Sequence, residues 1–413
     1  MPFNTTLGGI MNTRLSKILA LLLAVSTLLT ILVACNGGDV TTAGGPEGTP
    51  AATPTATATP NYSAYEKSDY IIASYIYNDY ESLSLDDMAK MSIVFAAFGL
   101  INELDNKMYH DHSEEFHYLI EARDIVKTTK IVVSIGGWGA DGFSQMARTA
   151  EGRATFIQSV MDFVDQYKLD GVDLDWEYPV SGGEIVHHDS DKDNFTLLMK
   201  ELREELDKRT AYDGGKMILS FAAAASSSYW RRSVDVEAVM PYVDYVNLMT
   251  YDYAGSWSNT TGHHTNHTAF KWDGKYEYQC GMQAVESAIR AGVPASKIIY
   301  GAAGYGKLFM GVTSKENNGL GQKYIGGCTD IALNDIVDLI GTGGYVKYWD
   351  NDAKAPYLFD GKNLVVYDDA ESVGYKVEYV STKGLAGIMF WEYAQDNENS
   401  FIINTAYDYF LSK

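Results

Sequence analysis

Apolar and polar positions alternate in a regular way along most of the chain. Short runs of aliphatic and β-branched residues predict eight strands, at 70–75, 93–98, 131–135, 171–175, 217–222, 245–249, 298–302 and 387–390. Amphipathic stretches predict helices between most of them, at 113–127, 151–167, 190–210, 276–291 and 370–383. This alternation is typical of a (β/α)8 TIM barrel, whose parallel strands are buried on both sides and therefore appear as continuous apolar runs. A doubly wound open sheet is the alternative, and eight units favour the barrel.

The chain between the seventh and eighth predicted strands is longer than one helix requires. It contains strand-like pieces and one helical stretch, at 344–348, 357–359, 364–366 and near 330–340. We therefore predict an α/β fold in which residues 69–304 and 369–413 form the barrel and residues 305–368 form a small inserted α+β domain. Trp349 and several tyrosines in this insertion suggest that it forms a wall that deepens a groove at the barrel mouth.

The first 68 residues do not have the pattern of the rest. Two basic residues precede an uncharged apolar stretch at 18–33, which leads into Leu-Val-Ala-Cys ending at Cys35. Residues 1–35 thus resemble a bacterial lipoprotein signal, which implies cleavage before Cys35 and lipid attachment to its sulfur. A plain signal peptide and a single short membrane span are the alternatives, and all three export the chain. Residues 36–68, rich in Gly, Thr, Pro and Ala, predict a disordered tether. We expect an exported protein, either anchored at the bacterial cell surface or secreted.

The composition limits the kinds of partner. A formal net charge of −22 argues against nucleic acid and against electrostatic adhesion to an anionic membrane, so we expect membrane contact through the lipid anchor only. Thirty tyrosines and seven tryptophans are many for 413 residues, and aromatic faces that stack on sugar rings are one common use of such a surplus.

Neither the cysteines nor the histidines predict a metal site or another cofactor. Apart from the predicted lipid-bearing cysteine, only Cys280 and Cys328 are present, too few for a disulfide framework or a four-ligand zinc site. They form either one disulfide or two free thiols, and free thiols are favoured. Three histidines lie close together in a polar, loop-like segment without acids or cysteines at ligand spacing, namely His263, His264 and His267.

The fourth predicted strand carries several acids in the sequence DGVDLDWEYP, residues 170–179. Because side chains alternate along a strand, Asp173, Asp175 and Glu177 share one face and the apolar residues between them share the other. Unpaired like charges in a protein interior cost several kcal/mol, roughly, so a fold does not gather them without use. An acidic edge strand facing water is the alternative. We interpret the run as a row of acids at the barrel mouth, where Glu177 ends the fourth strand.

Other strand ends bring aromatic and polar residues to the same mouth. The third strand ends in SIGGW, the sixth in MTYDY and the eighth in MFWE. An aromatic floor, a phenol and several carboxyls in one cup fit a site that cleaves sugars.

Together these residues resemble glycoside hydrolase family 18, specifically its chitinases. The family signature DxxDxDxE is filled by Asp170, Asp173, Asp175 and Glu177. The resemblance also covers SIGGW, MTYDYAGSW, YGAAGYG, GGYVKYWDNDAKAPYL and GIMFWEY, in order, over residues 70–410. It implies a TIM barrel with a chitinase-type insertion and a substrate of chitin or chito-oligosaccharides.

The resemblance implies a role for each residue of the catalytic group. Glu177 is the general acid, and Asp175 swings between Asp173 and the substrate to orient its 2-acetamido group. Tyr251 donates a hydrogen bond to the acetamido carbonyl, and Asp252 contacts the neighbouring sugar.

The resemblance also implies a set of substrate-binding residues. Trp391 forms the floor of the cleavage subsite, and Met249 packs below the acetamido methyl. Lys307 departs from the family pattern, which often has arginine there, and this puts the hydrogen bonding at that subsite in doubt. The groove is implied to be lined by Trp138, Trp257, Phe98, Tyr75, Tyr305 and Gly137.

The expected function is hydrolysis of β-1,4-linked N-acetylglucosamine polymers with retention of configuration. Because Asp175 lies beside the acid and not opposite it, the nucleophile must be the acetamido oxygen of the substrate itself, through an oxazolinium intermediate. We expect a monomer that needs no cofactor. The alternatives are an endo-N-acetylglucosaminidase on N-glycans or peptidoglycan and a non-catalytic chitin-binding lectin, which usually lacks the acid that Glu177 supplies here.

Overall fold

The computed structural model describes residue 62 and residues 65–272, 275–277, 279–396 and 399–413. The predicted lipoprotein signal, Cys35 and most of the predicted tether lie outside the described residues. Within these ranges no helix is both long enough and apolar enough to cross a membrane.

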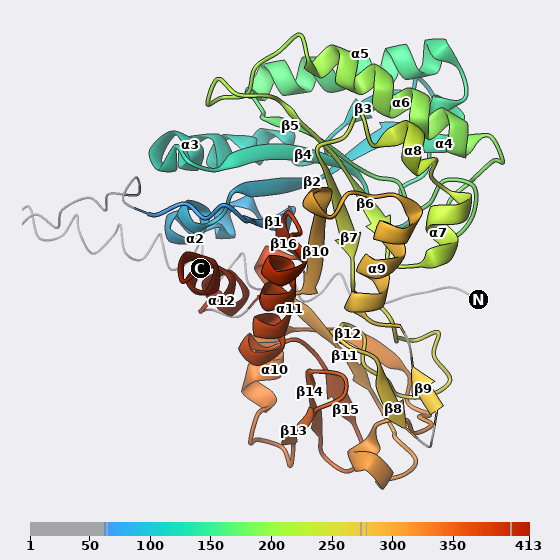
Figure 1. Cartoon of the computed structure of the whole chain (residues 1–413), viewed down its shortest axis with the longest axis vertical. Helices are drawn as coiled ribbons and strands as arrows, with labels where there is room; N and C mark the ends of the chain where they lie inside the picture. The colour runs from blue at the N-terminus through green and yellow to red at the C-terminus, as the bar shows by residue number, and fades with distance from the viewer. Residues whose placement is uncertain (1–61, 63–64, 273–274, 278, 397–398) are drawn as a thin grey trace, which may run out of the picture. The chain divides into compact units, whose positions relative to one another are not determined.

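Eight parallel strands form a closed barrel, as predicted (Figure 1). The strands are β1 (Ile71–Tyr77), β2 (Ile93–Asn102), β4 (Lys130–Gly136), β5 (Gly171–Asp175), β6 (Ile218–Ala224), β7 (Tyr245–Met249), β10 (Ile298–Ala303) and β16 (Gly387–Trp391). The sheet closes because β1 pairs in parallel with β2 on one side and with β16 on the other. The doubly wound open sheet is therefore excluded. A short antiparallel strand, β3 (Lys107–Tyr109), extends β2.

The long helices follow the predicted amphipathic stretches. They are α3 (Phe116–Val126), α5 (Ala150–Tyr167), α6 (Asp191–Leu206), α9 (Gly281–Ala291) and α11 (Ala370–Lys383). The prediction for α9 began too early, because Lys275–Glu277 form a strand, β9, in a hairpin with β8 (Phe270–Trp272). The sequence analysis missed several helices, most of them too short to show a clear period, namely α2 (Leu85–Lys90), α4 (Phe143–Ala147), α7 (Ser227–Arg232), α8 (Val236–Val239) and α12 (Phe401–Leu411).

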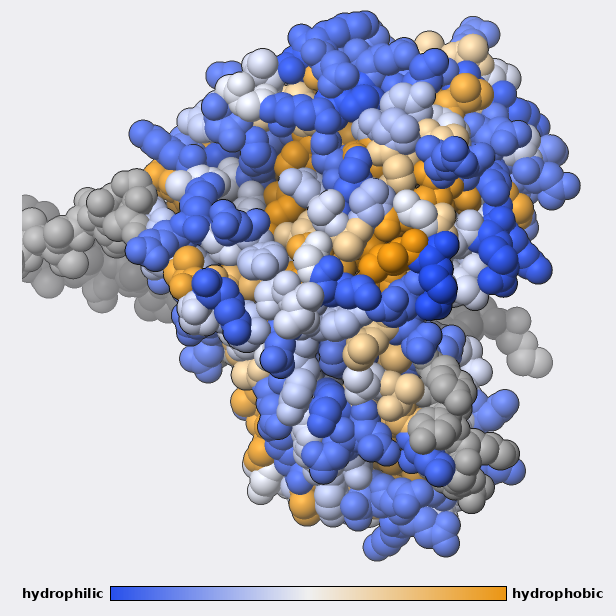
Figure 2. Space-filling view, viewed as in Figure 1, coloured by the Kyte–Doolittle hydropathy of each residue, from blue (hydrophilic) through white to orange (hydrophobic). Residues whose placement is uncertain are grey.

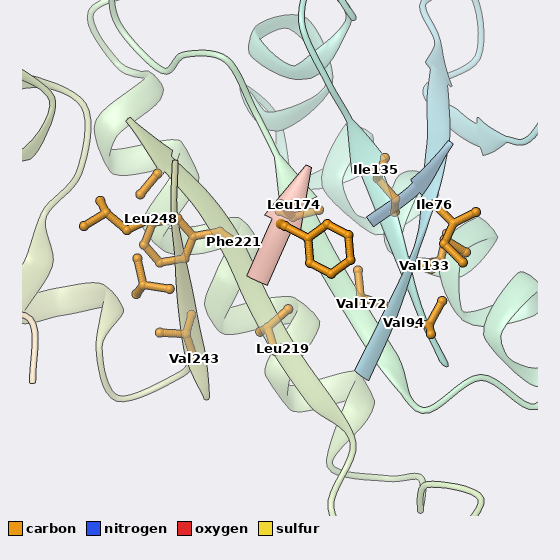
Figure 3. Packing of buried hydrophobic residues seen from close by; sticks show 14 of the residues in the cluster. Ile76, Val94, Val133, Ile135, Val172, Leu174, Leu219, Phe221, Val243 and Leu248 are labelled. Atoms are coloured by element: carbon orange, nitrogen blue, oxygen red, sulfur yellow. The ribbon is translucent and has the colours of Figure 1, made fainter. Parts of the chain in front are cut away.

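The barrel strands bury side chains on both faces. Outward-pointing residues such as Val133, Val172 and Leu174 pack in one cluster with the helices (Figure 3). Inward-pointing residues such as Phe95 and Val132 form a second cluster inside the barrel. Since β5 sends its apolar residues outward, its acids point inward, as the alternation predicted.

The chain between β10 and α11 forms a second sheet. Its elements are β11 (Tyr305–Phe309), β12 (Cys328–Ala332), α10 (Leu333–Leu339), β13 (Val346–Asp350), β14 (Ala355–Phe359) and β15 (Leu364–Val366). The strands pair in the order β12-β11-β15-β14-β13, all antiparallel. The helix predicted near 330–340 begins at Leu333, because the preceding residues extend β12, a half-exposed strand with little apolar pattern. This sheet has its own apolar core around Phe309, Leu364 and Val366.

The visible surface is mostly hydrophilic (Figure 2). On the face drawn in Figure 2, hydrophilic residues cover most of the outer helices, and hydrophobic residues show mainly toward the middle of the barrel. Cys280 is buried and Cys328 is partly buried, and both are free thiols.

Candidate active site

The acids of the DxxDxDxE run lie before, within and after β5. Asp170 precedes the strand, and its carboxylate accepts hydrogen bonds from the backbone N–H groups of Ile131 and Tyr212, both at 2.8 Å. Asp173 and Asp175 lie within the strand, which ends at Asp175. Glu177 therefore follows the strand instead of ending it, two residues beyond its last hydrogen-bonded position.

Asp173 is completely buried and receives four hydrogen bonds from four other strands. Its carboxylate accepts from Ser134 and Ser220 hydroxyls at 2.7 Å each, from the Tyr75 hydroxyl at 2.9 Å and from the Asn247 side-chain amide at 3.2 Å. Burial raises the pKa of Asp173, and these hydrogen bonds oppose the rise. Ser134, Ser220 and Asn247 were not predicted, because nothing local in the sequence links them to the acid.

Asp175 and Glu177 have environments that favour the protonated carboxyl. Burial, reinforced by the charges of Glu177 and Asp173, raises the pKa of Asp175 well above its ordinary value. Among the described residues, Asp175 Oδ1 has no hydrogen-bond partner although it is buried. Burial raises the pKa of Glu177 to about 7; a hydrogen bond from Tyr178 opposes the rise and the charge of Asp252 adds to it.

A cavity of about 600 Å³ lies above these acids at the carboxyl ends of the barrel strands. Asp175 and Glu177 line it, together with all but one of the residues predicted to line the groove and five others named from the resemblance. These ten residues are Tyr75, Phe98, Trp138, Met249, Tyr251, Asp252, Trp257, Tyr305, Lys307 and Trp391. Gly137 instead lines an adjoining cavity of about 470 Å³. Lining residues that the sequence analysis did not single out include Tyr178, Ser226, Gln279, Asp330 and Gln395.

The aromatic residues at the base of the cavity form a connected group around Trp391. Its ring stacks on Phe98, with the ring centroids 5.4 Å apart and the planes at 15°. The ring centroids of Tyr75 and Tyr77 lie 5.8 and 6.0 Å from that of Trp391, and Tyr77 lines the adjoining cavity. This arrangement gives the cavity an aromatic floor on which a sugar ring can stack.

A glycine allows β4 to end directly beside the acids. Gly136 has a φ of +121°, and a Cβ atom added there would lie 2.1 Å from the backbone oxygen of Asp175. Only glycine fits this position, which explains the first glycine of the SIGGW sequence.

A second charged group lies on the side of the cavity formed by the insertion. Lys307 Nζ lies 2.9 Å from Asp252 Oδ1 and 2.6 Å from Asp330 Oδ1, and the Tyr305 hydroxyl donates to Asp252 at 2.7 Å. Burial in the cleft acts to raise the pKa of Asp252, but His264 and Lys307 outweigh it and the net shift is downward. Asp252 is therefore a permanent negative charge near Glu177.

Strands β11 and β12 thus contribute Tyr305, Lys307 and Asp330 to the cavity. The expectation for Trp349 is wrong. Its ring stacks on Tyr375 of α11, with centroids 6.1 Å apart, and it does not line the cavity.

The three clustered histidines lie in a loop, as predicted, but the loop is buried between the barrel and the second sheet. His263 Nε2 lies 3.2 Å from Asp350 Oδ2, and His267 Nδ1 lies 3.1 Å from the Tyr300 hydroxyl. His264 is completely buried behind Asp252, with its Nδ1 atom 3.8 Å from Asp252 Oδ1. No cluster of three potential metal ligands occurs within the described part of the chain.

Comparison with known proteins gives a consistent set of relatives. The family model described as "Glycosyl hydrolases family 18" matches residues 60–396. Chitinase A1 of Niallia circulans is 38% identical over 295 residues, which cover 66% of this chain and 41% of that protein.

Solved structures show the same similarity. A family 18 N-acetylglucosaminidase from Paenibacillus barengoltzii is 37% identical with a TM-score of 0.76, covering 82% of this chain and 99% of its own. Chitinase ChiW from Paenibacillus sp. str. FPU-7 is 35% identical with a TM-score of 0.76, covering 83% of this chain and 43% of its own. The chain therefore spans less than half the length of two of these relatives, Chitinase A1 and ChiW.

Proposed function

The chain belongs to glycosyl hydrolase family 18, and from this premise we propose that it is a chitinase that hydrolyses β-1,4-linked N-acetylglucosamine polymers. The observation that carries the proposal is the pair formed by Glu177 and Asp175 in the cavity. One is a buried acid with a pKa of about 7, and the other is a buried carboxyl with an unused acceptor. The stacked aromatic floor around Trp391 supports a sugar as the ligand.

Glu177 is suited to protonate the leaving glycosidic oxygen. A general acid works best when its pKa lies near the working pH, and at a pKa of about 7 roughly half of the enzyme is protonated at neutral pH. Proton transfer from Glu177 releases the sugar beyond the scissile bond as a free hydroxyl and leaves Glu177 ionised.

The nucleophile in the proposed reaction is the substrate's acetamido oxygen. Asp173, Asp175 and Glu177 all lie in or just after β5, so none of these three supplies a carboxylate on the opposite face of the sugar. The acetamido oxygen bonds to the anomeric carbon as the glycosidic bond breaks, forming an oxazolinium ring. Asp175 Oδ1, which lacks a hydrogen-bond partner among the described residues, accepts the acetamido N–H once the carboxyl turns from Asp173 toward the substrate, and Tyr251 donates to the carbonyl oxygen. Ionised Glu177 then takes a proton from the water that opens the ring, which restores the enzyme and retains the β configuration.

The first test replaces Glu177. The Glu177→Gln variant should lose kcat on N-acetylchitohexaose by about 1000-fold or more, while Kd by calorimetry stays within about twofold, because the amide keeps its shape but cannot transfer the proton. Glu184→Gln, the same change at an exposed glutamate nearby, is the control and should behave as wild type. If Glu177→Gln retained a tenth or so of the wild-type kcat, Glu177 would not be the acid.

The second test concerns the substrate's acetamido group. Fully deacetylated glucosamine oligomers should not be cleaved, a thiazoline mimic of the intermediate should inhibit, and proton NMR should detect the β anomer as the first product. Prompt appearance of the α anomer, or efficient cleavage with glucosamine before the scissile bond, would exclude the substrate-assisted route.

A second candidate activity comes from the Paenibacillus barengoltzii relative, which is an N-acetylglucosaminidase. Products from end-labelled chito-oligosaccharides distinguish the two. A chitinase releases dimers and longer fragments, whereas an N-acetylglucosaminidase releases single N-acetylglucosamine units. Binding of oligomers without any cleavage by the wild-type protein would favour the lectin alternative.

A further inference from the structure

Trp257 lies at the rim of the active cavity on a short turn. Its side chain is 61% exposed, although its ring faces the cavity. The turn is closed by a hydrogen bond from the Ser258 N–H to the Gly255 carbonyl at 2.9 Å, and the Gly255 N–H donates to the Ser258 hydroxyl at 3.1 Å. These bonds shape the turn, but they do not fasten it to the rest of the protein.

Tyr324, a residue of the second sheet's segment between β11 and β12, links this turn to the rest of the protein. Its hydroxyl lies 2.7 Å from the Ser258 carbonyl and 3.2 Å from the Gly255 carbonyl, one on each side of Trp257. A hydroxyl carries one proton, so the shorter contact, to Ser258, is the principal hydrogen bond. The Tyr324 ring itself is held edge-on against Phe309 of β11, at 5.0 Å between centroids.

Two further contacts set the direction of the indole ring. Lys307 Nζ lies 5.4 Å from the ring centroid of Trp257, within the range of a cation–π interaction. The ring also folds over Gly255, where an added Cβ atom would lie 2.5 Å from it. The glycine makes room for the ring, Lys307 attracts its face, and Tyr324 holds the turn that carries it.

We propose that Tyr324 is a positioning residue that fixes Trp257 as a platform for an N-acetylglucosamine unit at the rim of the cleft. The inference rests on the proposed function and deepens it. Through Tyr324 the inserted domain acts on substrate affinity by orienting a barrel-loop tryptophan, in addition to the residues that it places in the cavity directly. Since the Tyr324 hydroxyl touches no residue of the acid row, its loss affects binding and not the chemical step.

The test is Tyr324→Phe, which keeps the ring against Phe309 and removes only the hydroxyl. We expect KM for N-acetylchitohexaose to rise about threefold to tenfold, the usual effect of losing one hydrogen bond, with kcat within about twofold of wild type. Tyr357→Phe is the matched control. It removes a hydroxyl in the same domain whose hydrogen-bond acceptor is the Asn317 carbonyl, at 3.5 Å, and not a carbonyl of the Trp257 turn, so it should leave KM unchanged.

A double-mutant cycle separates positioning from general stability. In a Trp257→Ala background, Tyr324→Phe should cause no further rise in KM, because the platform is already absent. An equal rise in both backgrounds, or no rise in the wild-type background, would overturn the proposal.

Two further measurements keep the test decisive. Gly255→Ala displaces the indole ring while the Tyr324 side chain itself stays unchanged. This variant should raise KM when Trp257 is present and should not raise it in the Trp257→Ala background. It can be measured even if Tyr324→Phe folds poorly. The same cycle measured as Kd for the hexamer in Glu177→Gln protein does not need turnover. A wild-type protein that binds the hexamer without cleaving it would contradict the proposed hydrolysis, while the Kd cycle would still decide the role of Tyr324.

Discussion

At the scale of single residues, neighbours from other strands give three similar carboxyls different properties. Asp173 receives four hydrogen bonds, Asp175 has an acceptor without a partner, and Glu177 has a pKa of about 7. Burial acts on all three in the same direction. The hydrogen bonds to Asp173 and the negative charge of Asp252 near Glu177 separate them.

The charge of Asp252 predicts a change in pH dependence. Because this charge raises the pKa of Glu177, the Asp252→Asn variant should lower that pKa. Glu177 then loses its proton at lower pH, so the fall of kcat/KM on the alkaline side should move to lower pH by about half a unit. Steady-state measurements of kcat/KM on chito-oligosaccharides between about pH 4 and about pH 9 determine the position of this alkaline limb.

The control for this prediction is Glu392→Gln. Burial raises the pKa of Glu392 to about 7 as well, so it titrates in the same range as Glu177. If Glu177 sets the alkaline limb, Glu392→Gln leaves the pH of that limb unchanged. A limb that moved with Glu392→Gln and not with Asp252→Asn would show that the wrong carboxyl had been assigned.

At the scale of elements, a buried ion pair ties α11 to the loop that carries the three clustered histidines. Lys376 and Asp368 are both fully buried and hydrogen-bonded to each other. The Thr265 hydroxyl donates to Asp368 at 2.9 Å, the Ser372 hydroxyl donates to it at 2.7 Å, and Lys376 donates to Thr265 at 2.7 Å. Thr265 follows His264, which faces Asp252, so this pair supports the loop that borders the site.

Breaking the pair should be costly. Lys376→Met leaves Asp368 as a buried charge without its cation, so the free energy of unfolding should fall by about 3 to 5 kcal/mol. Urea denaturation followed by circular dichroism measures it.

The control is Lys383→Met on the same helix, whose partner Glu286 is partly exposed; it should cost less than about 1 kcal/mol. Equal losses for the two variants would mean that Asp368 is not held as a charge by Lys376.

At the scale of the whole molecule, we propose that the mature chain is anchored on the outer side of a bacterial membrane by lipid on Cys35. The support is the Leu-Val-Ala-Cys sequence after an apolar stretch and the Pro- and Thr-rich segment behind it. Such a segment would hold the barrel at a distance from the membrane, at roughly 3 Å per residue where proline extends it.

Cys35→Ala should prevent lipidation and release or mislocalise the protein. Detergent-phase partitioning of the expressed full chain measures this, because a lipidated protein enters the detergent phase. Cys328→Ala, the same change at a free thiol of the insertion, is the control and should partition as wild type does. Unchanged partitioning of Cys35→Ala, with the signal still cleaved, would refute lipidation.

The sequence by itself determined the barrel and the alternation that turns the acids of β5 inward. These features depend on local alternation, because the spacing of apolar residues in a strand or helix can be read from consecutive positions of the sequence. For the same reason the bounds of α11 and β15 were predicted correctly, whereas the half-exposed β12 and the short helices were missed.

Only the tertiary structure decided which residues surround the acids. Tyr75 and Asn247 both donate hydrogen bonds to Asp173, and they are 98 and 74 residues away from it in sequence. Likewise, Tyr324 reaches the turn that carries Trp257 across 66 residues. Such contacts produce no periodic pattern in the sequence, because they depend on which strand ends and loops the closed barrel brings together. The pKa of Glu177 depends on that closure too, since it is burial in the assembled cleft that raises it.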